Sequence, residues 1–114
     1  KPVTDSWITL LRVLIRNDDK FFVYKKSSKE WLSGQYEVPT FIIDTNDKNL
    51  SQYAHIDGVF DYLPDFKTGI TKYTITNKVL WCNQKEFKKL GLDLDNYSWG
   101  NINLSTASTK AINL

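Results

Sequence analysis

The chain has 114 residues, a net charge of +2, and a composition that is 41% hydrophobic and 25% charged. This size and composition are typical of one soluble globular domain with a single modest core. No apolar stretch approaches the roughly 20 residues that a membrane helix needs, so we expect no membrane partner. The single cysteine, Cys82, excludes an internal disulfide framework and indicates a reducing, cytoplasmic location. The single histidine, His55, excludes a zinc site built from several histidines.

Hydrophobic patterning predicts three strands in the first part of the chain, joined by polar turns at 17–20 and 25–30: Trp7–Ile15, Phe21–Lys25 and Gln35–Ile43. The first of them is apolar at both its odd and its even positions apart from Thr9 and Arg12, which is typical of a strand buried on both faces. The first two strands form a hairpin. The run Lys25, Lys26 and Lys29 is interpreted as a solvated loop.

A short helix is predicted next, capped by Asn46 or Asp47 and carrying Leu50, Tyr53 and Ala54 on one face. Residues Phe60–Pro64 are expected to be extended. Alternating apolar residues then predict a strand from Tyr73 to Trp81, in which Asn77 interrupts the pattern.

The last part of the chain is predicted to hold two helices. Asn83 is a cap for a helix over Gln84–Leu90, which Gly91 would end, and Ser105 is a cap for a helix over Thr106–Ile112. The residues between them, Leu92–Asn103, are predicted to be a loop. Strands and helices are therefore mixed without strict alternation, which indicates an α+β fold in a single domain, 1–114.

The stretch Trp31–Phe41, WLSGQYEVPTF, has the most specific order of residues in the chain. Gly34 permits a sharp bend or the close approach of another segment, and Pro39 ends the strand because it lacks an N–H. The run resembles the strand that leads into the catalytic box of Nudix hydrolases, Trp-Glu-Phe-Pro-Gly-Gly. Thr40 and Phe41 stand where that family has its paired glycines.

The glutamate-rich helix that holds magnesium in Nudix hydrolases has no counterpart in this sequence. Hard cations need several converging oxygen ligands, yet no glutamate lies between Val38 and Lys85. We therefore expect a Nudix-like mixed sheet flanked by short helices, without the Nudix box and without a metal or cofactor of its own. A Cys82–His55 pair has no supporting motif, and an inert buried thiol is the expected state of Cys82.

The candidate binding segment is Phe66–Ile75, FKTGITKYTI. Its lysines and hydroxyls are groups that contact phosphates and base edges, and its glycine adds backbone freedom: Lys67, Thr68, Gly69, Thr71 and Lys72. A polar hairpin tip without a binding role is the alternative interpretation.

Three blocks together resemble the C-terminal domain of the adenine DNA glycosylase MutY family, a Nudix-fold domain without the Nudix box. Trp31–Phe41 is similar to the family's Leu-Trp-x-Gly-x-Tyr-x-Phe-Pro. Phe66–Trp81 is similar to Phe-x-His-x-Phe-Ser/Thr-His followed by a strand, and Trp99–Ile112 to a tryptophan followed by an apolar-Ser-Thr-Ala helix. The resemblance spans nearly the whole chain.

The resemblance implies a domain that reads 8-oxoguanine opposite a mispaired adenine. Thr71 matches the Ser/Thr whose hydroxyl hydrogen-bonds the lesion, and a hydroxyl can sense the N7–H that guanine lacks. Ile70 matches the family's phenylalanine, while Lys72 and Thr68 match its two histidines. These last three positions depart from the family pattern, so their contacts would differ from the family's.

The implied partners are double-stranded DNA containing 8-oxoguanine opposite adenine and the catalytic domain of the same protein. The resemblance places that domain N-terminal to this one, with a 4Fe–4S cluster that a chain with one cysteine cannot hold. A chain that starts at Lys1 and lacks methionine is accordingly expected to be the C-terminal part of a longer protein. Two alternatives remain: a Nudix-type pyrophosphohydrolase, and a protein-interaction module with Trp7, Trp31, Trp81 and Trp99 exposed.

Overall fold

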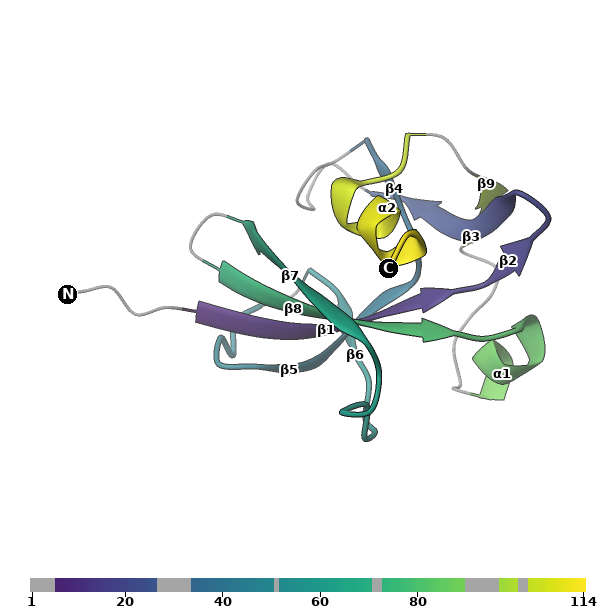
Figure 1. Cartoon of the computed structure of the whole chain (residues 1–114). Helices are drawn as coiled ribbons and strands as arrows, with labels where there is room; N and C mark the ends of the chain where they lie inside the picture. The colour runs from purple at the N-terminus through teal and green to yellow at the C-terminus, as the bar shows by residue number, and fades with distance from the viewer. Residues whose placement is uncertain (1–5, 27–33, 51, 71–72, 90–96, 101–102) are drawn as a thin grey trace.

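The computed structural model describes residues 6–26, 34–50, 52–70, 73–89, 97–100 and 103–114. Over these residues the chain forms two β-sheets and two short helices (Figure 1). The predicted α+β class is therefore confirmed.

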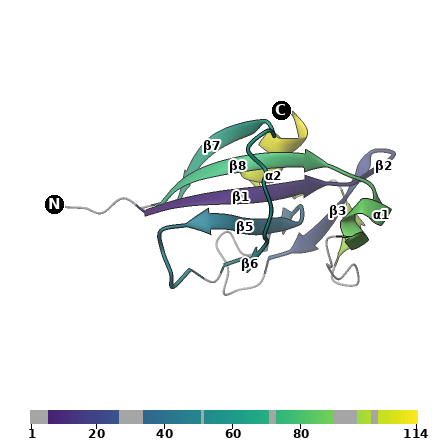
Figure 2. The same cartoon turned by 90° about the horizontal axis from the view of Figure 1, so that it is seen from below.

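The larger sheet is organised around a central strand, β1, which is parallel to β8 and antiparallel to β5 (Figure 2). Strand β7 forms one edge of this sheet and β6 the other. In the order in which they lie across the sheet, the five strands are β6 (Ala54–His55), β5 (Thr40–Thr45), β1 (Ser6–Leu14), β8 (Tyr73–Trp81) and β7 (Asp65–Ile70).

The smaller sheet is antiparallel and consists of β2 (Arg16–Asn17), β3 (Lys20–Lys25), β4 (Tyr36–Glu37) and β9 (Ser98–Gly100). The predicted hairpin between Trp7–Ile15 and Phe21–Lys25 is present only at its turn, where β2 pairs with β3. The first predicted strand itself pairs with β5 and β8 in the larger sheet. Strand β9 corrects the predicted loop at Leu92–Asn103, of which residues 92–96 and 101–102 lie outside the described residues. This strand forms because Trp99 packs its ring 4.9 Å from that of Phe22.

The predicted strand Gln35–Ile43 is divided between the two sheets, and Pro39 lies at the division. Strand β4 ends at Glu37 and β5 begins at Thr40, so the chain crosses from one sheet to the other at this point. Pro39 has no N–H to give to a ladder, but its carbonyl accepts a hydrogen bond from Val13 N at 2.9 Å. Gly34 adopts a φ of +86° with open space beside it, so it serves the bend and not a close approach.

Strand β1 is buried on both faces, as predicted. On one face Leu11 and Val13 join a cluster with Phe41 and Phe87. On the other face Ile8 and Leu10 pack with Ile42 and Ile75 at one end, and Leu14 packs with Val38, Val79 and Ala111 at the other. Arg12 lies between these two apolar clusters and is 2% exposed.

Both predicted helices are present with their predicted caps. Helix α1 (Gln84–Lys89) begins with a reciprocal pair of bonds: Glu86 N donates to Asn83 Oδ1 at 2.8 Å and Asn83 N donates to Glu86 Oε1 at 3.0 Å. Helix α2 (Thr106–Ile112) begins where Ser108 N donates to Ser105 Oγ at 3.2 Å. Leu90 and Gly91 lie outside the described residues. Neither helix is long and apolar enough to span a membrane.

Two predicted segments are wrong over the described residues. The predicted helix after β5 is replaced by turns and by strand β6, which pairs in parallel with β5. Asp47 causes this in part, because its side chain accepts the N–H of Asn49 at 3.0 Å and so competes with helical bonding. The predicted extended segment Phe60–Pro64 contains a turn, closed by Leu63 N donating to Phe60 O at 3.1 Å.

Candidate functional site

The predicted binding segment forms an antiparallel hairpin between β7 and β8 at the edge of the larger sheet. Its pairing runs from Asp65↔Lys78 to Ile70↔Tyr73. Thr71 and Lys72, which join the two strands in the sequence, lie outside the described residues, as does the side chain of Ile70. The prediction that the Thr71 hydroxyl contacts a lesion therefore stays a prediction.

The remaining predicted residues lie on opposite faces of the hairpin. Thr68 and Gly69 line a cavity on the face of the sheet that α2 covers. Lys67 is exposed, and it donates to Thr76 Oγ1 at 2.8 Å. Since neighbouring residues of a strand point to opposite faces, Lys67 is directed away from that cavity. The hairpin therefore brings the side chain of Thr68 and the backbone of Gly69 to the cavity, while the side chain of Lys67 points to the other face.

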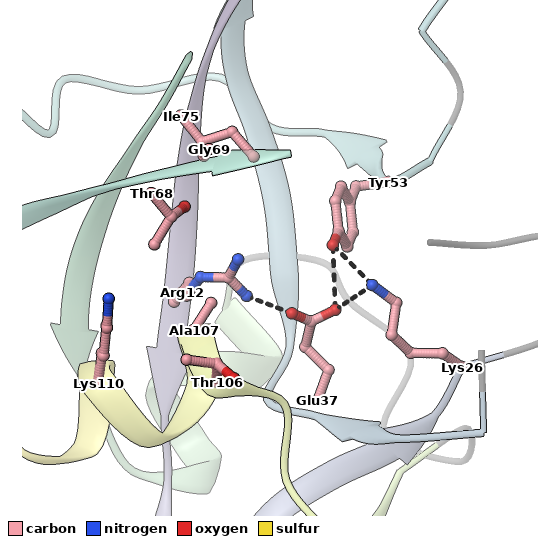
Figure 3. A pocket seen from close by; sticks show the side chains of 10 residues that line it. All are labelled: Arg12, Lys26, Glu37, Tyr53, Thr68, Gly69, Ile75, Thr106, Ala107 and Lys110. Carbon is pink, nitrogen blue, oxygen red and sulfur yellow. Dashed lines mark hydrogen bonds and ion pairs between the residues drawn. The ribbon is translucent and has the colours of Figure 1, made fainter. Parts of the chain in front are cut away.

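A cluster of buried charges forms the floor of the cavity (Figure 3). Glu37 lies at its centre and binds two cations: Arg12 Nη1 is 2.6 Å from Oε1, and Lys26 Nζ is 2.8 Å from Oε2. Tyr53 donates its hydroxyl to Oε2 at 3.0 Å and accepts a bond from Lys26 at 3.0 Å. Arg12, Lys26 and Glu37 are each at most 3% exposed, so the prediction that Lys26 belongs to a solvated loop is wrong.

The three charges of the cluster hold one another in their ionised forms. Burial acts to raise the pKa of Glu37, but Arg12 and Lys26 outweigh it, so the pKa lies below its ordinary value. Burial acts to lower the pKa of Lys26, but the Glu37 carboxylate outweighs it, so the pKa is raised. Burial and the same carboxylate raise the pKa of Tyr53. At neutral pH the cluster therefore carries two positive charges and one negative charge.

Asn77 links the charge cluster to the predicted binding hairpin. It is fully buried and accepts a bond from Arg12 Nε at 2.8 Å. Its amide nitrogen donates to Thr68 Oγ1 at 3.0 Å and to the carbonyl of Phe66 at 3.2 Å. Asn77, which interrupts the apolar alternation of β8, thus connects β7 to the centre of the sheet through its hydrogen bonds.

The cavity above the cluster has a volume of about 320 Å³. Its walls come from the hairpin, from the central strands and from α2, with Lys110 at one side (Figure 3). The lining residues are Arg12, Lys26, Glu37, Tyr53, Thr68, Gly69, Ile75, Thr106, Ala107 and Lys110.

Sequence reasoning missed the charged residues of this site. Arg12 carried a usable signal, because a charged residue inside an otherwise apolar strand is rarely buried without a partner. Asn77 carried a similar signal as the one polar interruption of its strand's buried face. Lys26, Glu37 and Tyr53 carried none, since they come from segments that only the fold brings together.

The other candidate groups are placed as follows. Cys82 is half-buried, and burial, with a smaller effect of Glu86, raises the pKa of its thiol to about 11. His55 is exposed on β6. Trp7 and Trp81 are 41% and 49% exposed, Trp99 is partly buried, and Trp31 lies outside the described residues. Within the described ranges, no three His, Cys, Asp or Glu side chains are grouped so that they could hold a metal ion.

No protein-family model and no curated protein matches this chain in sequence.

Proposed function

We propose that this chain is a DNA-lesion recognition domain of an adenine DNA glycosylase, reading 8-oxoguanine opposite a mispaired adenine, on a Nudix-like fold. The proposal rests first on the three sequence blocks, Trp31–Phe41, Phe66–Trp81 and Trp99–Ile112, whose order and spacing resemble that family. In this proposal the chain does no chemistry itself. The catalytic domain of the same protein, with its 4Fe–4S cluster, removes the adenine after extruding it from the duplex.

The observation that supports the proposal most is the anchoring of the β7–β8 hairpin. A reader of one base must present its contact residues on a rigid element, because a small misplacement loses the hydrogen bond. Here β7 lies at an open edge of the sheet, yet Asn77 ties Thr68 and Phe66 to Arg12 in the buried centre. The segment that joins the paired residues Ile70 and Tyr73 carries the proposed reading hydroxyl, Thr71, and the proposed phosphate contact, Lys72.

A second candidate is a protein-interaction module, and the exposure of Trp7 and Trp81 favours it. These two side chains do not make one patch, however. Trp7 pairs with Thr74 and Leu14 pairs with Trp81, so the two tryptophans lie seven residue steps apart along the sheet. At about 3.3 Å per residue, that separation is roughly 23 Å.

The test is an NMR titration of the ¹⁵N-labelled chain with a short duplex containing 8-oxoguanine opposite adenine. A duplex of the same sequence with guanine opposite adenine is the matched control. We expect amide shifts centred on 67–75 that are larger for the lesion duplex and that weaken as salt is raised. Thr71→Val should remove the difference between the duplexes, whereas Thr109→Val on helix α2, outside the hairpin, should keep it.

Equal shifts for both duplexes, spread over surface lysines, would reduce the role to nonspecific DNA docking. Shifts confined to the surroundings of Trp7 or Trp81 on addition of a protein partner, with none on addition of either duplex, would favour the interaction module.

A further inference from the structure

The buried charge cluster has an excess of positive charge. Arg12 and Lys26 are both bound to the single carboxylate of Glu37, and their side chains are 3% and 1% exposed. Among the described residues that line the cavity, Glu37 is the only carboxylate. An uncompensated buried charge costs free energy, and an anion in the adjoining cavity would lower that cost.

One nitrogen of Arg12 is available to such an anion. Its Nε donates to Asn77, and its Nη1 donates to Glu37 and to Thr40 at 3.1 Å. Its other terminal nitrogen, Nη2, has no acceptor among the described residues, and Figure 3 shows it pointing away from Glu37 on the side of Gly69 and Ile75. A guanidinium held at two of its nitrogens keeps a fixed direction at the third, which suits an oxyanion.

The size and the walls of the cavity narrow the class of ligand. Its volume of about 320 Å³ lies at the small end of the range for ligand pockets, about 300–1,000 Å³. Ile75, Ala107 and Gly69 provide apolar wall, while Lys110 adds a third cation, beside Arg12 and Lys26, at the side that the hairpin residue Thr68 borders. A small molecule with one oxyanion and an apolar body matches this arrangement.

We propose that this cavity binds a small organic anion, of the phosphate monoester class, whose oxyanion contacts Arg12 and whose apolar body packs against Ile75 and Ala107. This goes beyond lesion reading, because such a ligand needs neither DNA nor the residues Thr71 and Lys72. The same phosphate chemistry could come from a free small molecule or from a DNA backbone, and the experiment separates these two sources.

The experiment is a titration of the ¹⁵N-labelled chain with phenyl phosphate, followed through the Nε–H signal of Arg12. The chain has two arginines, so the signal of Arg16, which is exposed on β2 and does not line the cavity, serves as the internal control. We expect a saturable shift of the Arg12 signal with a Kd of about 1 mM or lower, no shift of the Arg16 signal, and no shift with phenol, the neutral analogue.

Variants test each part of the site. Lys110→Gln should weaken binding severalfold, whereas Lys88→Gln, a matched change in the last turn of α1, should leave it unchanged. Ala107→Leu should abolish binding by filling the cavity. Arg12→Lys keeps the charge and loses the planar fork, so binding should fall by more than about tenfold. Since Arg12→Lys could disturb folding, the two exposed lysine variants keep the test independent of stability.

Three results would overturn the proposal. The first is an Arg12 signal that does not move, which would mean that water alone fills the cavity. The second is equal loss of binding in Lys88→Gln and Lys110→Gln, which would indicate nonspecific ion pairing. The third is an Arg12 shift with an undamaged duplex but none with phenyl phosphate, which would assign the site to a DNA backbone phosphate. If phenyl phosphate binds as expected but the duplex titration gives no lesion-dependent shifts, only the proposed function is contradicted.

Discussion

The two faces of strand β1 are built on different principles. On one face Leu11 and Val13 pack against Phe41 and Phe87 without a polar interruption. On the other face Arg12 separates the apolar clusters at either end and bonds Glu37 and Asn77. The first face gains stability from burial alone. The second carries a cluster of buried charges, and such a cluster can often be replaced as a whole by hydrophobic residues of similar volume at little or no cost, whereas the loss of a single member is costly. The difference teaches that packing accounts for the apolar face, whereas the buried charges of the polar face call for a further reason, which the proposed anion site would supply.

The largest effect is expected from Glu37→Gln on the polar face. This change leaves Arg12 and Lys26 buried without their common carboxylate, so we expect the free energy of unfolding to fall by about 3–5 kcal/mol. Urea denaturation followed by tryptophan fluorescence measures it. Asp65→Asn is the control, because Asp65 pairs with Lys78 at 3.0 Å in a partly exposed position where a pair contributes under about 1 kcal/mol. Similar losses in both variants would contradict the buried cluster.

On the apolar face, Leu11→Ala should cost about 3 kcal/mol, since it removes a fully buried side chain and leaves a cavity among aromatic rings. The same urea experiment measures this loss. The m-value, which is the slope of the unfolding free energy against urea concentration, should stay unchanged. The proposed binding of phenyl phosphate should also stay unchanged. A loss of binding as large as that in Arg12→Lys would mean that the two faces do not act separately.

Arg12→Met sharpens the comparison, because it removes charge from the polar face but keeps the Lys26–Glu37 pair. We expect a cost of about 2 kcal/mol, mainly from the bond that Asn77 loses. Equilibrium unfolding of Arg12→Met beside Glu37→Gln checks this order. If Arg12→Met were the more damaging of the two, Arg12 would be retained for stability and not for binding.

The two helix caps provide a smaller contrast of the same kind. Asn83 caps α1 beside the apolar face and is exposed, so Asn83→Ala should cost about 1 kcal/mol. Ser105 caps α2 beside the polar face, is fully buried, and places its Oγ 3.3 Å from Glu37 Oε1. Ser105→Ala should therefore cost more, about 2 kcal/mol. Thermal unfolding of both variants measures the difference, and equal shifts in Tm would remove Ser105 from the cluster.

The free energy of unfolding should depend least on pH near neutrality. The folded pKa of Glu37 lies below its ordinary value of 4.5, so the stabilisation from this group is complete above that pH. It is lost as the pH falls from about that value through the lowered folded pKa. The wild-type chain should therefore lose stability below that pH more steeply than Glu37→Gln, while both should change little between neutrality and that value. Parallel acid profiles would contradict the direction of the pKa shift.

The sequence by itself determined the elements whose signals are local. The apolar run around Leu11 indicated a strand buried on both faces, Pro39 indicated a strand end, and the caps Asn83 and Ser105 indicated where two helices begin. These signals depend on backbone chemistry and on periodicity within about ten residues, so they can be read without the fold. Asp47 could not be assigned from the sequence, because its side chain can either cap a helix or close a turn.

Only the tertiary structure decided the candidate site. Arg12, Lys26, Glu37 and Tyr53 come from four separate segments, and the three charges and the Tyr53 hydroxyl meet because the chain crosses between two sheets at Pro39. The free energy of burying a charge depends on the partners that surround it in space and not on its neighbours in the chain. For that reason one network beneath the β7–β8 hairpin contains residues that the sequence did not connect. They are Lys26, which was assigned to a solvated loop, Glu37, which had no metal role, and Asn77, which interrupts a strand.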